Sequence, residues 1–184
     1  MHNNPNEALV RFLNRQANSN PNSLPLSFFK RGQILSLTPD CQGGIILQKQ
    51  FYADFVGSGA VVGSSLDVNC RSIYVIGSVK FQTSPSFAER QQALQKRIAY
   101  LERLQEIAQE YAPEQRACLI LHQLSEWVGC EEVKKIPNEL VAQIAGLFAK
   151  TIDCVRKNYP VNTSRNYASV TSTSTTAPCR VPIN

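Results

Sequence analysis

Three basic side chains stand close together in one short stretch of the chain: Lys150, Arg156 and Lys157. Lysine and arginine bind the phosphates of nucleic acids, and a lysine also reaches the edge of a guanine in the major groove. Thr151 can add a hydroxyl contact to the same backbone. Asp153 lies among them and opposes a phosphate unless it accepts a hydrogen bond from a cytosine. This stretch therefore suits a nucleic-acid contact, provided that a helix brings these residues to one face.

The surrounding stretch, IPNELVAQIAGLFAKTIDCVRK, is predicted to form two short helices joined by a tight turn. Leu140 and Ile144 give the first helix an apolar face, and Ile152 and Val155 do the same for the second. Gly146 suits the sharp turn because glycine tolerates a positive φ. This is the pattern of a helix-turn-helix, whose second helix can enter the major groove. The alternative is an ordinary helical hairpin inside a core. The residues predicted on or beside the outer face are Phe148, Ala149, Lys150, Thr151, Asp153, Cys154, Arg156 and Lys157.

A second candidate site follows an apolar run in the first half of the chain. The segment GSSLDVNCRS can turn backbone N–H groups toward a phosphate, with a charge-assisted contact from Arg71 and a hydroxyl from Ser72. The alternative, a loop between strands with a solvated arginine, is the one we favour because the β region around it is small. The candidate ligand residues are Gly63, Ser64, Ser65, Leu66, Arg71 and Ser72.

Groups suited to catalysis or to metal binding do not cluster in the sequence. The six cysteines contain no C-x-x-C pair, so we expect reduced, mostly buried thiols. His122 stands on an apolar helical pattern without a nucleophile or carboxylate at a matching spacing, and a core histidine is the simpler interpretation. We therefore expect no catalytic residues, no metal site, no cofactor and no enzymatic activity.

The hydrophobic pattern of the elements that must position these sites changes along the chain. Short apolar runs separated by Gly, Asp and Pro predict antiparallel strands in the first half, and helical periodicity follows. The predicted fold class is α+β, with a short antiparallel, jelly-roll-like N-terminal β domain, a long central dimerisation helix and a C-terminal helix-turn-helix domain. The expected units are an N-terminal helix and linker (1–25), the β domain (26–85), the long helix (86–111), the helix-turn-helix domain (112–158) and a disordered tail (159–184).

The long helix carries apolar residues at spacings of three and four. Its other faces carry charged residues, Arg97 among them. A long helix with a narrow apolar seam favours a partner helix, and we expect a parallel homodimer. The alternative is a helix that lies on its own domain. The seam residues are predicted to be Leu94, Ile98, Leu101 and Leu104.

Length and charge limit the class of protein. The chain has 184 residues with a formal net charge of +5, and 43% of its residues are hydrophobic, which is enough for a buried core and leans toward an anionic partner. No apolar run approaches the ~20 residues of a membrane span, and the first residues lack the pattern of a signal peptide. We therefore expect a cytoplasmic protein without membrane association.

The order of elements and three motifs resemble the Crp/Fnr family of bacterial transcription regulators. The motifs are the helix-turn-helix with Gln143 and Gly146, the segment APEQRACLILHQLSEWVG with Arg116, and the stretch VVGSSLDVNCRSIYVIGSVKF. The last resembles that family's cyclic-nucleotide cassette, which makes 26–85 an abbreviated cyclic-nucleotide-binding-like domain. Ser64 stands where the family carries an acidic residue that binds the ribose, so we do not expect tight binding of cyclic AMP.

The resemblance implies a sequence-specific regulator that binds double-stranded DNA as a homodimer, with RNA polymerase as a further partner. The alternative is a degenerate relative that acts as a protein-interaction module without binding DNA.

Overall fold

The computed structural model describes residues 5–19, 24, 34–84 and 86–158 of the chain. The predicted tail (159–184) and most of the predicted linker lie outside these residues. The helices are α1 (Pro5–Ser19), α2 (Phe87–Ala108), α3 (Pro113–Val128), α4 (Cys130–Lys135), α5 (Asn138–Ala145) and α6 (Ala149–Asn158), with a 3-10 turn η2 (Ser64–Leu66). The strands are β1 (Ile34–Leu37), β2 (Gly43–Gln48), β3 (Ala53–Val56), β4 (Val61–Gly63), β5 (Ser72–Gly77) and β6 (Phe81–Gln82). The mixed α+β class predicted from the sequence is confirmed.

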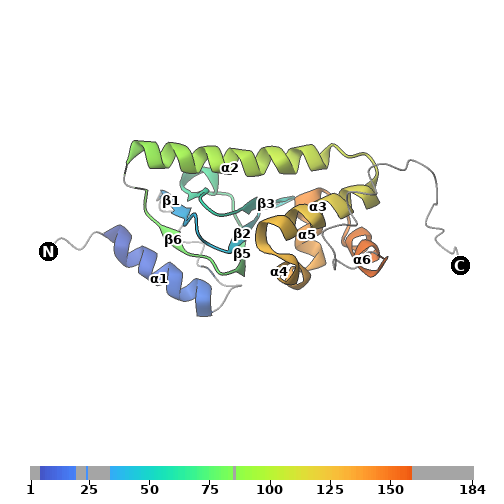
Figure 1. The fold of residues 1–184 in the computed structure, drawn as a ribbon, viewed down its shortest axis with the longest axis horizontal. Coiled ribbons are helices and arrows are strands. Elements are labelled where there is room, and N and C mark those ends of the chain that lie inside the picture. The colour runs from blue at the N-terminus through green and yellow to red at the C-terminus, as the bar shows by residue number, and fades with distance from the viewer. Residues whose placement is uncertain (1–4, 20–23, 25–33, 85, 159–184) are drawn as a thin grey trace, which may run out of the picture.

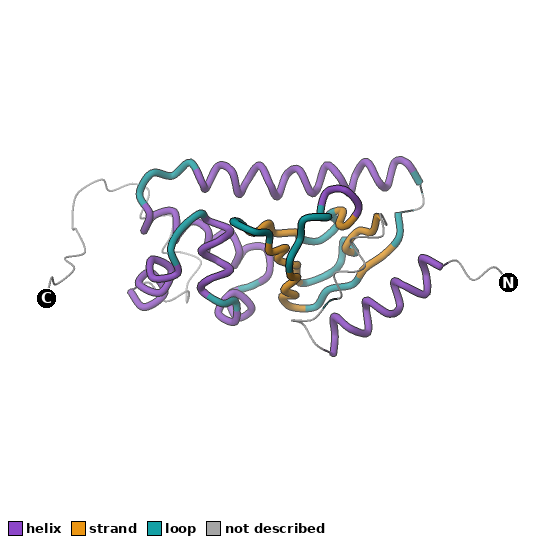
Figure 2. Tube along the Cα trace, turned by 180° about the vertical axis from the view of Figure 1, so that it is seen from behind, coloured by secondary structure: helices purple, strands orange, loops and turns teal. Residues whose placement is uncertain are grey.

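The strands form two small antiparallel sheets, in the orders β4-β1-β6 and β3-β2-β5. In the second sheet Ile45 of β2 stands opposite Val56 of β3 on one side and Val75 of β5 on the other. Figure 1 shows the strands between the long helix α2 and the N-terminal helix α1, with α3 to α6 gathered at one end. Figure 2 shows the same arrangement from behind.

One apolar core lies between the two sheets and includes the inner side of α1. Leu13 of α1 is fully buried there, and the side chain of Asn14 pairs with the backbone of β6 at Phe81, accepting at 2.7 Å and donating at 3.2 Å. Helix α1 is thereby joined to the β unit. The sheet residues of this core are Leu35, Leu37, Val62 and Phe81 on one side and Ile45, Leu47, Val56, Ile73 and Val75 on the other.

A second core joins the sheet β3-β2-β5 to the C-terminal helices. Ile46, Phe55 and Ile76 turn away from the first core and pack in one cluster with α3, α4, α5 and α6. Strand β2 is therefore buried on both faces, which explains its unbroken apolar run in place of an alternating one. The helices are packed directly onto the sheet.

Helix α2 begins where the sequence predicts. Ser86 is the N-cap: its hydroxyl accepts from the backbone of Glu89, and the Glu89 carboxylate accepts from the backbone of Ser86. This reciprocal pair satisfies two N–H groups at the helix start. The helix ends at Ala108, three residues before Tyr111, where the apolar spacing placed its end.

Two predictions about α2 are wrong. Leu104 is buried in the chain's own core beside Ile107, so it offers no surface to a partner helix. Arg97, which was expected on a polar face, is only 3% exposed. Leu94, Ile98 and Leu101 remain 41%, 44% and 37% exposed. The apolar periodicity thus combined two neighbouring stripes, one covered by the chain itself and one open to solvent.

The segment after α3 is also helical. Helix α4 is short and carries ion pairs at i,i+3 from Glu131 to Lys134 and from Glu132 to Lys135. These pairs stabilise an exposed helix by small amounts. Among the helices that the structure describes, none has the length and apolar character required to cross a lipid bilayer.

Candidate nucleic-acid interface

The turn between α5 and α6 has the geometry expected of Gly146. Its φ of 63° and ψ of 42° lie in the left-handed region, and the backbone N–H of Leu147 donates to Ala142 at 2.8 Å. A side chain at Gly146 would be strained in this conformation, so glycine allows α5 to end sharply here. The predicted pair of short helices around this turn is present.

The inner faces of α5 and α6 hold the pair in place. Val141 and Ile144 of α5 and Ile152 and Val155 of α6 are buried in the core that includes α3. Turning α6 about its axis would expose Ile152 and Val155 to water. The burial of these four side chains therefore fixes the orientation of α6. The outward residues of α6 therefore have a defined direction.

The outer face of α6 carries most of the residues predicted for it. Phe148, just before the helix, is 84% exposed, and Lys150, Cys154 and Lys157 are also exposed. Thr151 and Asp153 are half-buried, and Ala149 packs partly against the core. The structure thus brings the predicted residues other than Arg156 onto one side of α6, with Ala149 at its edge.

Asp153 and Lys157 pair with each other on this face. The Lys157 ammonium lies 2.7 Å from the Asp153 carboxylate one turn earlier, and this hydrogen bond raises the pKa of Lys157. Both side chains are substantially exposed, so the pair is weak and open to exchange with another anion. Lys150 has no ion pair of its own among the described residues.

Arg156 does not occupy the position that the sequence predicted. Its guanidinium donates to the backbone oxygens of Ile136 at 2.9 Å and Val133 at 3.0 Å, at the C-terminal end of α4. Burial lowers its pKa. A cation at the carbonyl end of a helix is favourable, so Arg156 fastens α6 to α4 and does not face outward. Its assignment as a phosphate contact is therefore corrected.

Arg116 plays a similar part on the other side of the turn. Its Nε donates to the backbone oxygen of Glu110 at 2.8 Å, and its Nη1 lies 3.5 Å from the backbone oxygen of Ala145 at the end of α5. The side chain thereby links the segment after α2 to the turn at Gly146. Arginines on both sides thus position α5 and α6.

Three of the predicted ligand residues are exposed, and a fourth is paired within the chain. Ser65, Leu66 and Arg71 are exposed, and the side chain of Ser72 donates to the Gln48 amide at 2.5 Å. Gly63 ends β4, and Ser64 begins the turn η2. The loop between β4 and β5 is present as predicted, and the Ser72 hydroxyl at its end is already paired with Gln48.

A buried charged group that was not predicted from the sequence occupies the inside of this loop. Asp67 is fully buried and accepts from the backbone N–H of Gly63 at 2.8 Å. Its other oxygen lies 3.3 Å from Nη2 of Arg97, which is also 3.4 Å from Asp54, itself paired with Lys49 at 3.1 Å. Burial raises the pKa of Asp67, and the attraction of Arg97 and the Gly63 N–H offset this in part.

The position of Arg97 on α2 was a sequence signal for this charged cluster. Arg97 lies four residues after Ala93 and three before Tyr100, on the stripe that α2 turns toward its own chain. A charged residue inside a buried stripe requires a partner of opposite charge. The sequence indicates no such partner for Arg97, because Asp67 is distant in the chain.

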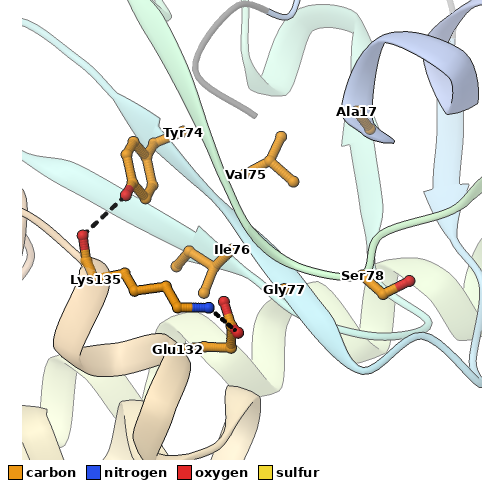
Figure 3. Close-up of a pocket in the computed structure, with 8 residues that line it drawn as sticks. All are labelled: Ala17, Tyr74, Val75, Ile76, Gly77, Ser78, Glu132 and Lys135. Carbon is orange, nitrogen blue, oxygen red and sulfur yellow. Dashed lines mark hydrogen bonds and ion pairs between the residues drawn. The ribbon is translucent and has the colours of Figure 1, made fainter. Parts of the chain in front are cut away.

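A cavity of about 450 Å³ lies elsewhere, between β5 and α4 (Figure 3). Three of its polar side chains are already paired: the Tyr74 hydroxyl donates to the backbone oxygen of Lys135 at 3.0 Å, and the Lys135 ammonium is 2.6 Å from Glu132. Burial raises the pKa of Tyr74. These contacts connect α4 to the sheet.

Comparison with protein-family models, with curated proteins and with solved structures finds no match to this chain. The resemblance to the Crp/Fnr family therefore depends on its motif residues alone. Within the described ranges, no group of three or more His, Cys, Asp or Glu side chains is arranged to hold a metal ion.

Proposed function

We propose that the chain is a sequence-specific, DNA-binding transcription regulator of the Crp/Fnr type. The observation that supports this most strongly is the exposed row on α6, with Lys150, Cys154 and Lys157 outward and Ile152 and Val155 buried behind them. In this proposal α6 enters the major groove and α5 lies across its edge.

Lys150 is the residue nearest the bases in this arrangement. It stands in the first turn of α6 and has no ion pair among the described residues. Lys157 lies near the other end of α6. It breaks its ion pair with Asp153 and binds a DNA phosphate in place of that carboxylate. Arg156 does not contact DNA in this proposal. It positions α6 by holding that helix against α4.

The homodimer forms in this proposal through the open stripe of α2. Phe87, Leu94 and Leu101 recur every seven residues, with Ile98 between them, and all four are exposed. A seven-residue repeat of this kind suits a parallel two-stranded coiled coil. Two copies related by a two-fold axis would present two α6 helices, which bind successive major grooves when they are about 34 Å apart.

In the same proposal, the two sheets form an abbreviated jelly-roll domain that does not bind cyclic AMP tightly. RNA polymerase is a further partner. The protein is not an enzyme, and it works in the cytoplasm. The alternative, a protein-interaction module, is favoured by the large exposed area of Phe148, since exposed aromatics also mark protein contacts.

Selection from random duplexes followed by a salt titration separates the two functions. We expect enrichment of one motif, a relaxed preference in Lys150→Ala, and a binding slope lowered by about one unit in Lys157→Ala. Lys96→Ala is the matched control, because it removes an exposed lysine from α2. Failure to enrich any sequence, with unchanged DNA retention of both α6 variants, would favour the interaction module.

A further inference from the structure

The guanidinium of Arg97 has more hydrogen-bond donors than the structure uses. Its Nη2 contacts both Asp54 and Asp67, whereas Nη1 is shielded from solvent and has no partner among the described residues. A buried donor without an acceptor costs free energy. The surroundings of Arg97 therefore favour additional anionic oxygen.

The Asp67 carboxylate is held in the way a protein holds a bound oxyanion. One of its oxygens accepts from a backbone N–H, that of Gly63, and the other faces a guanidinium. Main-chain N–H groups and arginines are the usual donors to carboxylates and phosphates. Asp54 differs, because its side chain is 13% exposed and is shared with Lys49.

The conformation of the turn after β4 allows the Asp67 carboxylate to reach the Gly63 N–H of the same loop. Gly63 has a φ of 96°, which reverses the chain at the end of β4, and η2 then brings Asp67 back toward the Gly63 N–H after four residues. The carboxylate thus reaches the inside of the loop, where a phosphate was the less favoured of the two interpretations of the sequence.

We infer that Arg97 and the Gly63 N–H form a binding site for a small carboxylate, and that the chain's own Asp67 is its resident ligand. With Asp67 in place, α2 is held to the β unit without any added molecule. Removing the Asp67 carboxylate opens the site to an external carboxylate of similar size. This inference concerns the β unit and α2, and does not depend on DNA binding.

Chemical rescue with formate tests the site directly. Asp67→Ala removes the carboxylate and keeps both donors, so formate should raise its thermal midpoint by about 2–4 °C over chloride at equal ionic strength, as a ligand of the folded state does. Asp67→Asn is the matched control: its amide fills the same volume, so formate should add nothing. The double variant Asp67→Ala/Arg97→Met, which lacks the guanidinium, should also show no gain.

A milder variant covers the case in which Asp67→Ala does not fold in chloride. Asp67→Ser leaves room for formate and retains an acceptor for the Gly63 N–H. If either variant folds in formate but not in chloride, the site is supported. Equal thermal midpoints in the two salts for Asp67→Ala and Asp67→Ser, or failure of formate to restore folding to either, would overturn it.

Discussion

The side-chain amide of Gln48 in β2 donates a hydrogen bond of 2.9 Å to the amide oxygen of Gln143 in α5. Gln48 also accepts from the hydroxyl of Ser72, so one glutamine joins the first residue of β5 to the first helix of the α5–α6 pair. Both glutamines are half-buried. The β unit and the proposed DNA-contacting helices are therefore coupled by a polar contact in addition to their shared apolar core.

The Gln48–Gln143 contact should contribute measurably to stability. Gln143→Ala leaves the Gln48 amide without this acceptor, and we expect a loss of about 1 kcal/mol in the free energy of unfolding by urea. Gln48→Ala combined with Gln143→Ala should cost less than the sum of the single changes, because the two side chains share one interaction. Gln95→Ala, an exposed change on α2, serves as the control. Strict additivity of the two single changes would contradict the coupling.

Phe55 should be among the most sensitive positions of the core. Its ring stacks on Trp127 with centroids 4.9 Å apart and meets Tyr100 edge-on at 5.5 Å. We expect Phe55→Ala to cost about 3–5 kcal/mol and to shift the emission of Trp127, the only tryptophan, to longer wavelength. Phe51→Ala removes an exposed ring, so it should change stability by less than about 0.5 kcal/mol. Similar effects of the two changes would disprove the role assigned to Phe55.

Arg156 and Lys157 are neighbours in sequence and should behave differently. Arg156→Met removes the contacts to Val133 and Ile136, so we expect a loss of about 1–3 kcal/mol in the free energy of unfolding. Lys157→Met removes an exposed ion pair and should cost less than about 1 kcal/mol. Urea unfolding of the two variants makes the comparison. Equal stability of both variants would mean that Arg156 does not position α6.

The exposed stripe of α2 should control association. Leu94→Glu together with Leu101→Glu places charges in the proposed seam, and we expect sedimentation velocity to show a monomer where the unchanged chain is a dimer. Gln95→Glu changes the charge beside the stripe and should leave the dimer intact. A monomeric unchanged chain at the same concentration would rule out the seam.

Cys70 should resist alkylation and should make stability fall at high pH. Burial raises its pKa to about 11, and its thiol donates to the backbone oxygen of Ser72. At about pH 8 we therefore expect that, of the five cysteines that the structure describes, iodoacetamide labels exposed Cys154 first and Cys70 last.

The direction of the pH effect follows from the raised value. The folded chain keeps the Cys70 proton to a higher pH than the unfolded chain does, so this contribution is complete below the ordinary value of 9.0 and is lost as pH rises toward about 11. Cys70→Ser should flatten the fall in the free energy of unfolding across this window. An unchanged pH profile in that variant would show that Cys70 does not titrate as described.

Interactions within a few residues could be predicted from the sequence. The capping pair of Ser86 and Glu89 spans one helical turn, and the turn at Gly146 depends on its own φ. The alternation between short strands and long helical patterns likewise reflects neighbouring residues. For this reason the sequence by itself determined the α+β class, the position of the long helix and the pair of helices around Gly146.

Contacts between distant residues were decided only by the tertiary structure. Arg97 and Asp67 are 30 residues apart, and Gln48 and Gln143 are 95 apart. Helical periodicity shows which residues share a stripe, but it does not show which of two adjacent stripes is covered, so Leu104 was assigned to a partner helix and Arg97 to solvent. The direction of Arg156 was equally hidden, because the oxygens that it binds belong to the end of another helix. Packing determines these contacts, since a charged group can be buried only where the fold brings it a partner.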